Sequence, residues 1–286
     1  MASLKIIRKR ITSVKSTQKI TKAMKMVAAA KLRRAQEAAE AARPYADKIT
    51  SLLRNVAARV EATSHPLLQQ RPEQRHIDLV LVTADRGLCG GYNTNLIRKA
   101  ETFVHEHGAD KVRITVVGRR GFDYFKKRPV TVAEKYINLF RGPDSELAQR
   151  LATHLATEYA AERSDGVYVI YSHFRSPLVQ VPTVQQILPI VAEEGAAKDT
   201  TDYLYEPSEA ELLDRLLHRY ITVMFLHAFL EAVASEHGAR MTAMDSATSN
   251  ASDMINRLTL EMNRARQAAI TKELMEIIGG AEALKG

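Results

Sequence analysis

Several residue types are scarce in this chain of 286 residues, and each scarcity narrows the possible functions. There is no Trp, and the single cysteine, Cys89, has no partner for a disulfide within the chain. This excludes an internal disulfide switch and favours a reducing compartment. No run approaches the roughly 20 consecutive apolar residues that a membrane-spanning helix needs. The sequence therefore predicts a protein that does not cross a membrane.

Acidic residues are missing from the first 36 residues, which hold 11 of the 41 Lys and Arg residues. The other 250 residues carry 30 basic and 33 acidic groups, so the net charge of +8 arises entirely near the N-terminus. A mitochondrial targeting peptide has this composition. However, the helical spacing of apolar residues continues unbroken past this segment, and a peptide that is removed has no reason to continue the spacing of the chain that follows it. Two interpretations remain: a solvated basic helix face, or a basic surface that binds acidic protein loops or nucleic acid.

Glycine and proline, which break helices most strongly, are absent from the first 43 residues. Pro44 is expected to bend the helix rather than end it, because helical spacing continues from Ile49 to Val56. An apolar stripe begins with steps of three and four at Leu4, Ile7, Ile11 and Val14. We expect Gln18 to interrupt this stripe, which then resumes slightly shifted at Ile20, Met24 and Val27. The pattern predicts one long amphipathic helix.

The C-terminal segment also has the sequence pattern of a long helix. Ser208 and Glu211 have the spacing of a capping box, which starts a helix, and Gly238 is the only glycine in the next 70 residues. Small and Met side chains then form a coiled-coil seam over four heptads: Met241, Met244, Thr248, Ala251, Ile255, Leu258, Met262, Ala265 and Ala269. We expect the helix tip to extend past its partner and to expose an apolar face.

Strands alternate with helices between these two ends. Strands are predicted within residues 76–91, 111–121, 165–174 and 181–191, and helices within residues 93–108, 122–129 and 146–163. Strands separated by helices indicate a mostly parallel sheet. The predicted fold class is α/β: a Rossmann-like domain (75–195) inserted between N-terminal (1–64) and C-terminal (208–286) helices that form a long antiparallel coiled coil.

The loop of residues 85–91 lies where a doubly wound fold would hold a nucleotide phosphate. Its glycine spacing is neither GxGxxG nor GxxxxGK[ST], and no Lys-Ser or Lys-Thr pair follows it. A nucleotide-binding enzyme is therefore the weaker alternative, and a tight strand-to-helix turn is the stronger one. A nucleophilic role for Cys89 is a further alternative, although no His that could act as its base lies nearby in the sequence. The histidines lack metal-ligand spacing, so we predict no catalytic, metal or cofactor site.

Four separated segments resemble one family, the gamma subunit of bacterial-type F-type ATP synthase. They are ITKAMKMVAAAKLRRAQ (20–36), ADRGLCGGYNTN (84–95), RMTAMDSATSNASDMI (240–255) and ARQAAITKELMEIIGGAEA (265–283). The resemblance implies a non-catalytic central rotor shaft that couples ion-driven rotation of the c ring to conformational changes in the catalytic beta subunits. It implies contacts with the alpha and beta hexamer, the epsilon subunit and the c ring, without nucleic acid. It also implies a peripheral location on the cytoplasmic side of the cell inner membrane.

The resemblance extends to individual residues. Arg266 and Gln267 resemble the pair that hydrogen-bonds a beta-subunit catch loop, and Met24 and Lys25 resemble the position facing an acidic beta-subunit lever. The segment that contacts epsilon and the c ring is matched by Tyr203, Tyr205 and Glu206. Early basic residues could oppose acidic partner loops: Lys9, Arg10 and Lys15. The insertion with a cysteine pair found in chloroplast-type members is missing from this sequence, so thiol control is not expected.

Overall fold

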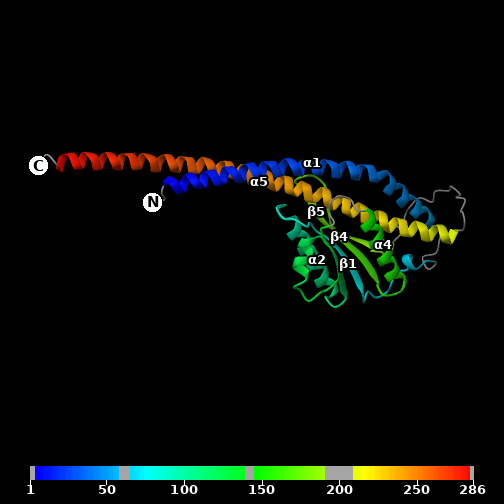
Figure 1. Ribbon diagram of the computed structural model, residues 1–286. Coiled ribbons are helices and arrows are strands. Elements are labelled where there is room, and N and C mark those ends of the chain that lie inside the picture. Colours follow the sequence, from blue (N-terminus) through cyan, green and yellow to red (C-terminus); the bar gives the residue numbers. More distant parts are fainter. Residues whose placement is uncertain (1–3, 58–64, 139–144, 191–208, 284–286) are drawn as a thin grey trace. The chain divides into compact units, whose positions relative to one another are not determined.

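The computed structural model of the chain describes residues 4–57, 65–138, 145–190 and 209–283 (Figure 1). The chain divides into two compact units: residues 28–240, and residues 1–27 together with 241–286. Two long helices contribute to both units, α1 (Leu4–Ala57) and α5 (Glu209–Ala283). α1 continues through Pro44, as predicted.

The larger unit, residues 28–240, is built on a five-stranded sheet with the order β3-β2-β1-β4-β5. The strands are β1 (Ile77–Val82), β2 (Val112–Val117), β3 (Thr131–Tyr136), β4 (Gly166–Phe174) and β5 (Gln180–Leu188). β1 pairs in parallel with β2 and β4, β2 pairs in parallel with β3, and β5 is antiparallel to β4. The predicted, mostly parallel sheet is confirmed.

The sequence patterns missed β3. This strand lies at the edge of the sheet and pairs with β2. Its side chains alternate between exposed and half-buried, from Thr131 to Tyr136, so it has no buried apolar run. Edge strands are commonly charged like this one, which holds Glu134 and Lys135 at its centre.

Helices cover both faces of the sheet. α2 (Tyr92–His107) and α3 (Arg119–Phe125) pack on one face, whereas α4 (Ser145–Ala160) and part of α5 pack on the other. A short 3-10 helix, η1 (Pro66–Leu68), packs into the core on the side of the sheet that α4 and α5 cover. β1 serves both cores because its side chains alternate between the two faces and all are buried.

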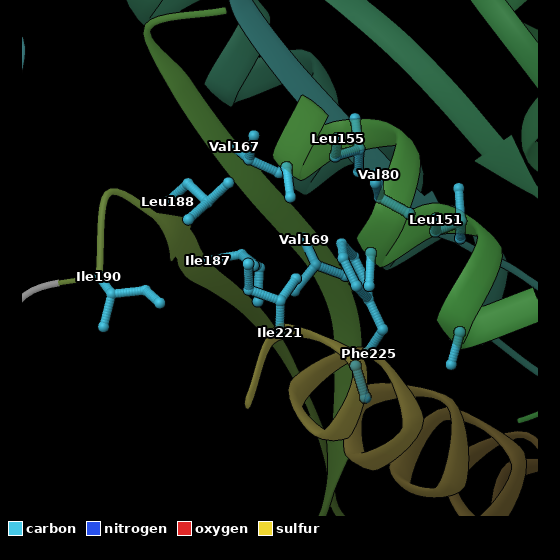
Figure 2. Packing of buried hydrophobic residues seen from close by; sticks show 14 of the residues in the cluster. Val80, Leu151, Leu155, Val167, Val169, Ile187, Leu188, Ile190, Ile221 and Phe225 are labelled. Atoms are coloured by element: carbon cyan, nitrogen blue, oxygen red, sulfur yellow. The ribbon is translucent and has the colours of Figure 1, made fainter. Parts of the chain in front are cut away.

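The core beneath α4 and α5 is made of large aliphatic and aromatic side chains (Figure 2). Leu151 of α4, Val169 of β4 and Phe225 of α5 all contribute to this core (Figure 2). Among the described residues, α5 is the one helix long and apolar enough to cross a membrane by length and composition alone. Half of its most apolar window is nevertheless buried inside the structure. Two of the apolar residues of α5, Ile221 and Phe225, pack in this core.

The smaller unit is an antiparallel pair formed by α1 up to residue 27 and α5 from residue 241. Thr21 pairs with Thr248, and Lys25 pairs with Asp245, so contacts move back along α5 as they advance along α1. Every predicted seam position of α5 is buried or half-buried, which confirms the seam. All residues from 270 to 280 are exposed, which confirms that the tip of α5 extends beyond the paired stretch.

The predicted shift of the α1 stripe after Gln18 is wrong. The steps of three and four continue through Gln18, Thr21 and Lys25, whereas Ile20 is 60% exposed and Val27 is 57% exposed. Polar side chains occupy the seam because the other helix supplies their partners. The hydroxyl of Thr21 lies 2.8 Å from that of Thr248. The sequence could not reveal these partners, because they lie more than 200 residues away.

Candidate partner-binding surfaces and the occupied crevice

The loop between β1 and α2, residues 85–91, has the geometry of a tight turn. Leu88 and Gly90 adopt positive φ angles of 61° and 57°. The Nε and Nη2 atoms of Arg240 donate to the carbonyl oxygen of Gly87 over 3.4 and 3.3 Å. A phosphate-binding loop presents backbone N–H groups to an anion. This loop instead presents a carbonyl oxygen to a cation of the chain's own α5.

α5 also fills the crevice at the carboxyl ends of β1 and β4. Ligands of doubly wound folds bind in this crevice, because the strand order reverses there. Here the hydroxyl of Ser235 donates to the carbonyl oxygen of Ser172 over 2.8 Å. On the α2 side, the hydroxyl of Tyr92 donates to the carbonyl oxygen of Ala232 over 3.1 Å. The place where a nucleotide would bind is therefore taken by the chain's own helix.

A fourth contact completes this docking. Glu231 of α5 accepts the backbone N–H of Phe174, at the end of β4, over 2.7 Å. Together with the Arg240, Ser235 and Tyr92 contacts, it forms what we call the polar anchor of α5. Glu231 is nearly buried, as is Arg240, so these polar contacts are largely shielded from water.

Charged and titratable groups surround Arg240. Its Nη1 atom lies 2.6 Å from a carboxylate oxygen of Glu236. Burial raises the pKa of Glu236, and the neighbouring Arg240 only partly offsets this effect. Burial, and then the charges of Arg240 and Lys31, lower the pKa of His237 to about 4. At neutral pH His237 is therefore uncharged, and its Nδ1 atom, 3.2 Å from Nη1 of Arg240, can accept a hydrogen bond.

Cys89 has the surroundings of a structural residue. It is buried, and the Nδ2 atom of Asn93 donates to its sulfur over 3.2 Å. Burial raises the pKa of the Cys89 thiol, which disfavours the thiolate that a nucleophile requires. The structure therefore gives no support to the nucleophile alternative. Within the described ranges, no three His, Cys, Asp or Glu side chains gather in a group that could hold a metal ion.

The outward side of α1 in the smaller unit is both basic and apolar. A shallow depression near its start is lined by Leu4, Lys5, Arg8, Lys9, Thr12 and Ser13. Large apolar side chains are exposed further along the same helix: Ile6, Ile20, Met26 and Val27. Exposed apolar groups beside charged ones are typical of a surface that binds another protein.

The tip of α5 is a second uncovered surface. Arg266 and Gln267 are exposed, next to the last seam positions, Ala265 and Ala269. Beyond them, large apolar side chains are more than half exposed: Ile270, Leu274, Met275, Ile277 and Ile278. The spacing of Ile270, Leu274 and Ile277 places them along one face of the helix.

Comparison with known proteins shows which family this chain belongs to. The protein-family model described as ATP synthase matches residues 3–284. The ATP synthase gamma chain of Geobacter metallireducens is 54% identical and that of Pelotomaculum thermopropionicum 49% identical, each over the full length of both chains. The chain belongs to the ATP synthase gamma-chain family. The family predicted from the four sequence segments is thereby confirmed.

Solved structures of ATP synthase assemblies contain chains with the same fold. A chain of the Euglena gracilis mitochondrial ATP synthase structure containing OSCP, F1 and c-ring has a TM-score of 0.69 and 21% identity, covering 98% of this chain and 94% of its own length. A chain from the central stalk and c-ring of the Tetrahymena thermophila enzyme has a TM-score of 0.60 and 24% identity, covering 80% and 99%. The predicted fold, a coiled coil with an inserted α/β domain, is confirmed by the structure and is shared by these solved chains.

The residues predicted for gamma-family contacts lie in different surroundings. Lys25 is half-buried, and its Nζ atom lies 2.6 Å from Asp245, a partner that sequence reasoning missed. Met24 is also half-buried. The structure does not bring these residues together with Arg266 and Gln267, which lie some twenty residues beyond Asp245, at the end of the seam. Three further predicted residues lie outside the described residues: Tyr203, Tyr205 and Glu206.

Proposed function

We propose that this gamma-family chain is the central rotor shaft of an F-type ATP synthase. It couples ion-driven rotation of the c ring to conformational changes in the catalytic beta subunits, for ATP synthesis or hydrolysis. Its partners are the alpha and beta hexamer, the epsilon subunit and the c ring. The observation that carries the proposal is the tip of α5, where residues 270–280 are all exposed and several are large and apolar. A shaft tip inside a ring of subunits requires such a surface.

The shaft acts by contact rather than by chemistry. The basic and apolar side of α1 and the Arg266 side of α5 differ in character, so a rotating shaft presents a different surface to each beta subunit in turn. A partner that binds one state of a protein better shifts the population towards that state. The occupied crevice supports a non-catalytic role, since α5 lies where a nucleotide would bind. The chain reaches the cytoplasmic side of the cell inner membrane indirectly, through the c ring.

Individual residues have proposed roles. The guanidinium of Arg266 and the amide of Gln267 hydrogen-bond a catch loop of the beta subunit, a role that suits the fork of donors on Arg. Met24 and Lys25 face the acidic beta-subunit lever, where Asp245 competes with the lever for the charge of Lys25. The foot of the shaft contacts epsilon and the c ring through Tyr203, Tyr205 and Glu206.

Replacing Arg266 tests the catch-loop role. In the assembled complex, Arg266→Ala should lower the rate of ATP hydrolysis roughly three- to tenfold, because one charge-assisted hydrogen bond to a partner is lost. The substitution should not change the free energy of unfolding of the isolated chain, since Arg266 is exposed. Arg98→Ala, at an exposed position of α2, is the matched control and should leave turnover unchanged. Equal rates for the two variants would refute the catch-loop role.

Isolation of the chain with its partners tests the wider proposal. Mild extraction followed by mass spectrometry should recover the chain with alpha, beta, epsilon and c subunits. Recovery of the chain alone, or with nucleic acid, would contradict the rotor assignment.

A further inference from the structure

We propose that the polar anchor locks α5 to the α/β sheet against sliding and against rotation about the helix axis. Its side chains are therefore positioning residues through which torque passes into the shaft. This inference rests on the proposed rotor function. Under that function the sheet domain is turned by the c ring, and α5 carries the turn onwards because it is one uninterrupted helix from Glu209 to Ala283.

The positions of the contacts suit this role. Glu231, Ala232 and Ser235 lie within about one helical turn, whereas Arg240 lies five residues further, or about 8 Å along the axis. The helix is thus held at two heights. Its partners belong to separate elements: Ser172 and Phe174 to β4, Tyr92 to α2, and Gly87 to the loop after β1.

Apolar packing alone would hold the helix less strictly. Hydrophobic burial is non-directional, whereas a hydrogen bond weakens steeply when its angle is distorted. The seam beyond residue 240 is rich in small and Met side chains, which tolerate sliding. The anchor therefore supplies a directional constraint just before the chain enters a permissive seam.

Gly238 keeps α5 close enough for these contacts. A Cβ atom at this position would lie 3.1 Å from the ring of Phe174 and 3.3 Å from the Cα atom of Pro177. These distances are tighter than most contacts that a Cβ makes, so the helix lies directly against the end of β4. The anchor bonds form across this close approach.

A pair of matched double variants tests the proposal in the assembled complex. Tyr92→Phe with Ser235→Ala removes two anchor hydroxyls without enlarging any side chain. Tyr159→Phe with Ser164→Ala removes two equally buried hydroxyls that donate to the carbonyl oxygens of Gln69 and Gly166, away from α5. Both complexes are reconstituted in vesicles, and ions transported per ATP hydrolysed are measured beside amide hydrogen exchange in residues 229–240.

Of the two double variants, we expect only the one that carries Tyr92→Phe and Ser235→Ala to transport fewer ions per ATP while still hydrolysing ATP. Its exchange in residues 229–240 should rise roughly tenfold, because two buried hydrogen bonds are lost. Replacing Ser235→Ala by Ser235→Thr restores a hydroxyl and should recover part of the coupling. Equal coupling and equal exchange in the two double variants would overturn the proposal. If instead the unaltered chain fails to assemble or to support transport, the rotor function itself fails.

Discussion

α5 is one helix with two different ways of packing. In the larger unit it buries large side chains almost completely against the sheet, as at Leu217, Ile221 and Phe225. In the smaller unit its seam carries Met244, Thr248 and other small or flexible residues, most of them only half-buried. The first packing, together with the polar anchor, fixes the position of the helix, whereas the second leaves room for twisting and for outside partners. A shaft needs both properties at different points along its length.

The largest expected effect comes from the part of α5 in the core. Phe225→Ala should lower the free energy of unfolding by about 3–5 kcal/mol, because Phe225 is fully buried and its removal leaves a cavity. Ile255→Ala in the half-buried seam should cost only about 1–2 kcal/mol. Urea unfolding of each purified chain, followed by circular dichroism, measures both. Equal losses in the free energy of unfolding would show that the two ways of packing do not differ in how strongly they stabilise the chain.

Lowering the pH should have a smaller effect on the free energy of unfolding, through His237 in the last turn of α5 within the larger unit. His237 has a pKa of about 4 in the folded chain and about 6.5 when unfolded, so the unfolded state gains a proton first as the pH falls. The stability that His237 contributes is complete above pH 6.5 and is lost towards pH 4. The loss should reach about 2 kcal/mol at pH 5.

The variant His237→Asn isolates this contribution. Glu236 acts in the opposite sense: burial raises its pKa, so the folded state retains its proton better and its contribution falls as the pH rises through that pKa. Unfolding measured from pH 7 to pH 4 should therefore show a shallower acid-side loss in the variant than in the unaltered chain. Parallel curves would mean that His237 is not the sensitive group.

The smallest effect is expected in the seam. Thr248→Val preserves shape but removes the hydroxyl that contacts Thr21, and should cost about 1 kcal/mol or less because the site is half-buried. Thr259→Val is the control, since its hydroxyl donates to the carbonyl oxygen of Ile255 on its own helix. A difference between the two variants would measure how far the polar pair fixes the register of the two helices. No difference would show that the small-residue seam sets the register unaided.

Periodicity predicted the elements that bury a continuous apolar face. The seam of α5 was found because its apolar spacing repeats over four heptads, and β1 was found because it is a short, mostly apolar run. The edge strand β3 was missed because its burial alternates weakly. The α1 stripe was misplaced because Thr21 and Lys25 are polar, and only their distant partners make them seam residues.

The contacts of the glycine loop illustrate the same limit. Its turn-like spacing and its lack of a phosphate-binding motif were visible in the sequence. That its carbonyl group would bind Arg240 was not visible, because the two residues lie 153 positions apart. Close approach between distant segments depends on the whole fold, and local pattern carries no information about it.

The bare tip of α5 has a consequence for the cell that makes the protein. Residues such as Leu274 and Ile277 favour self-association in water unless another molecule covers them. Every copy made in excess of its partners is a target for self-association and for the quality-control proteases. Synthesis of this subunit must therefore be matched in number to the ring that receives it.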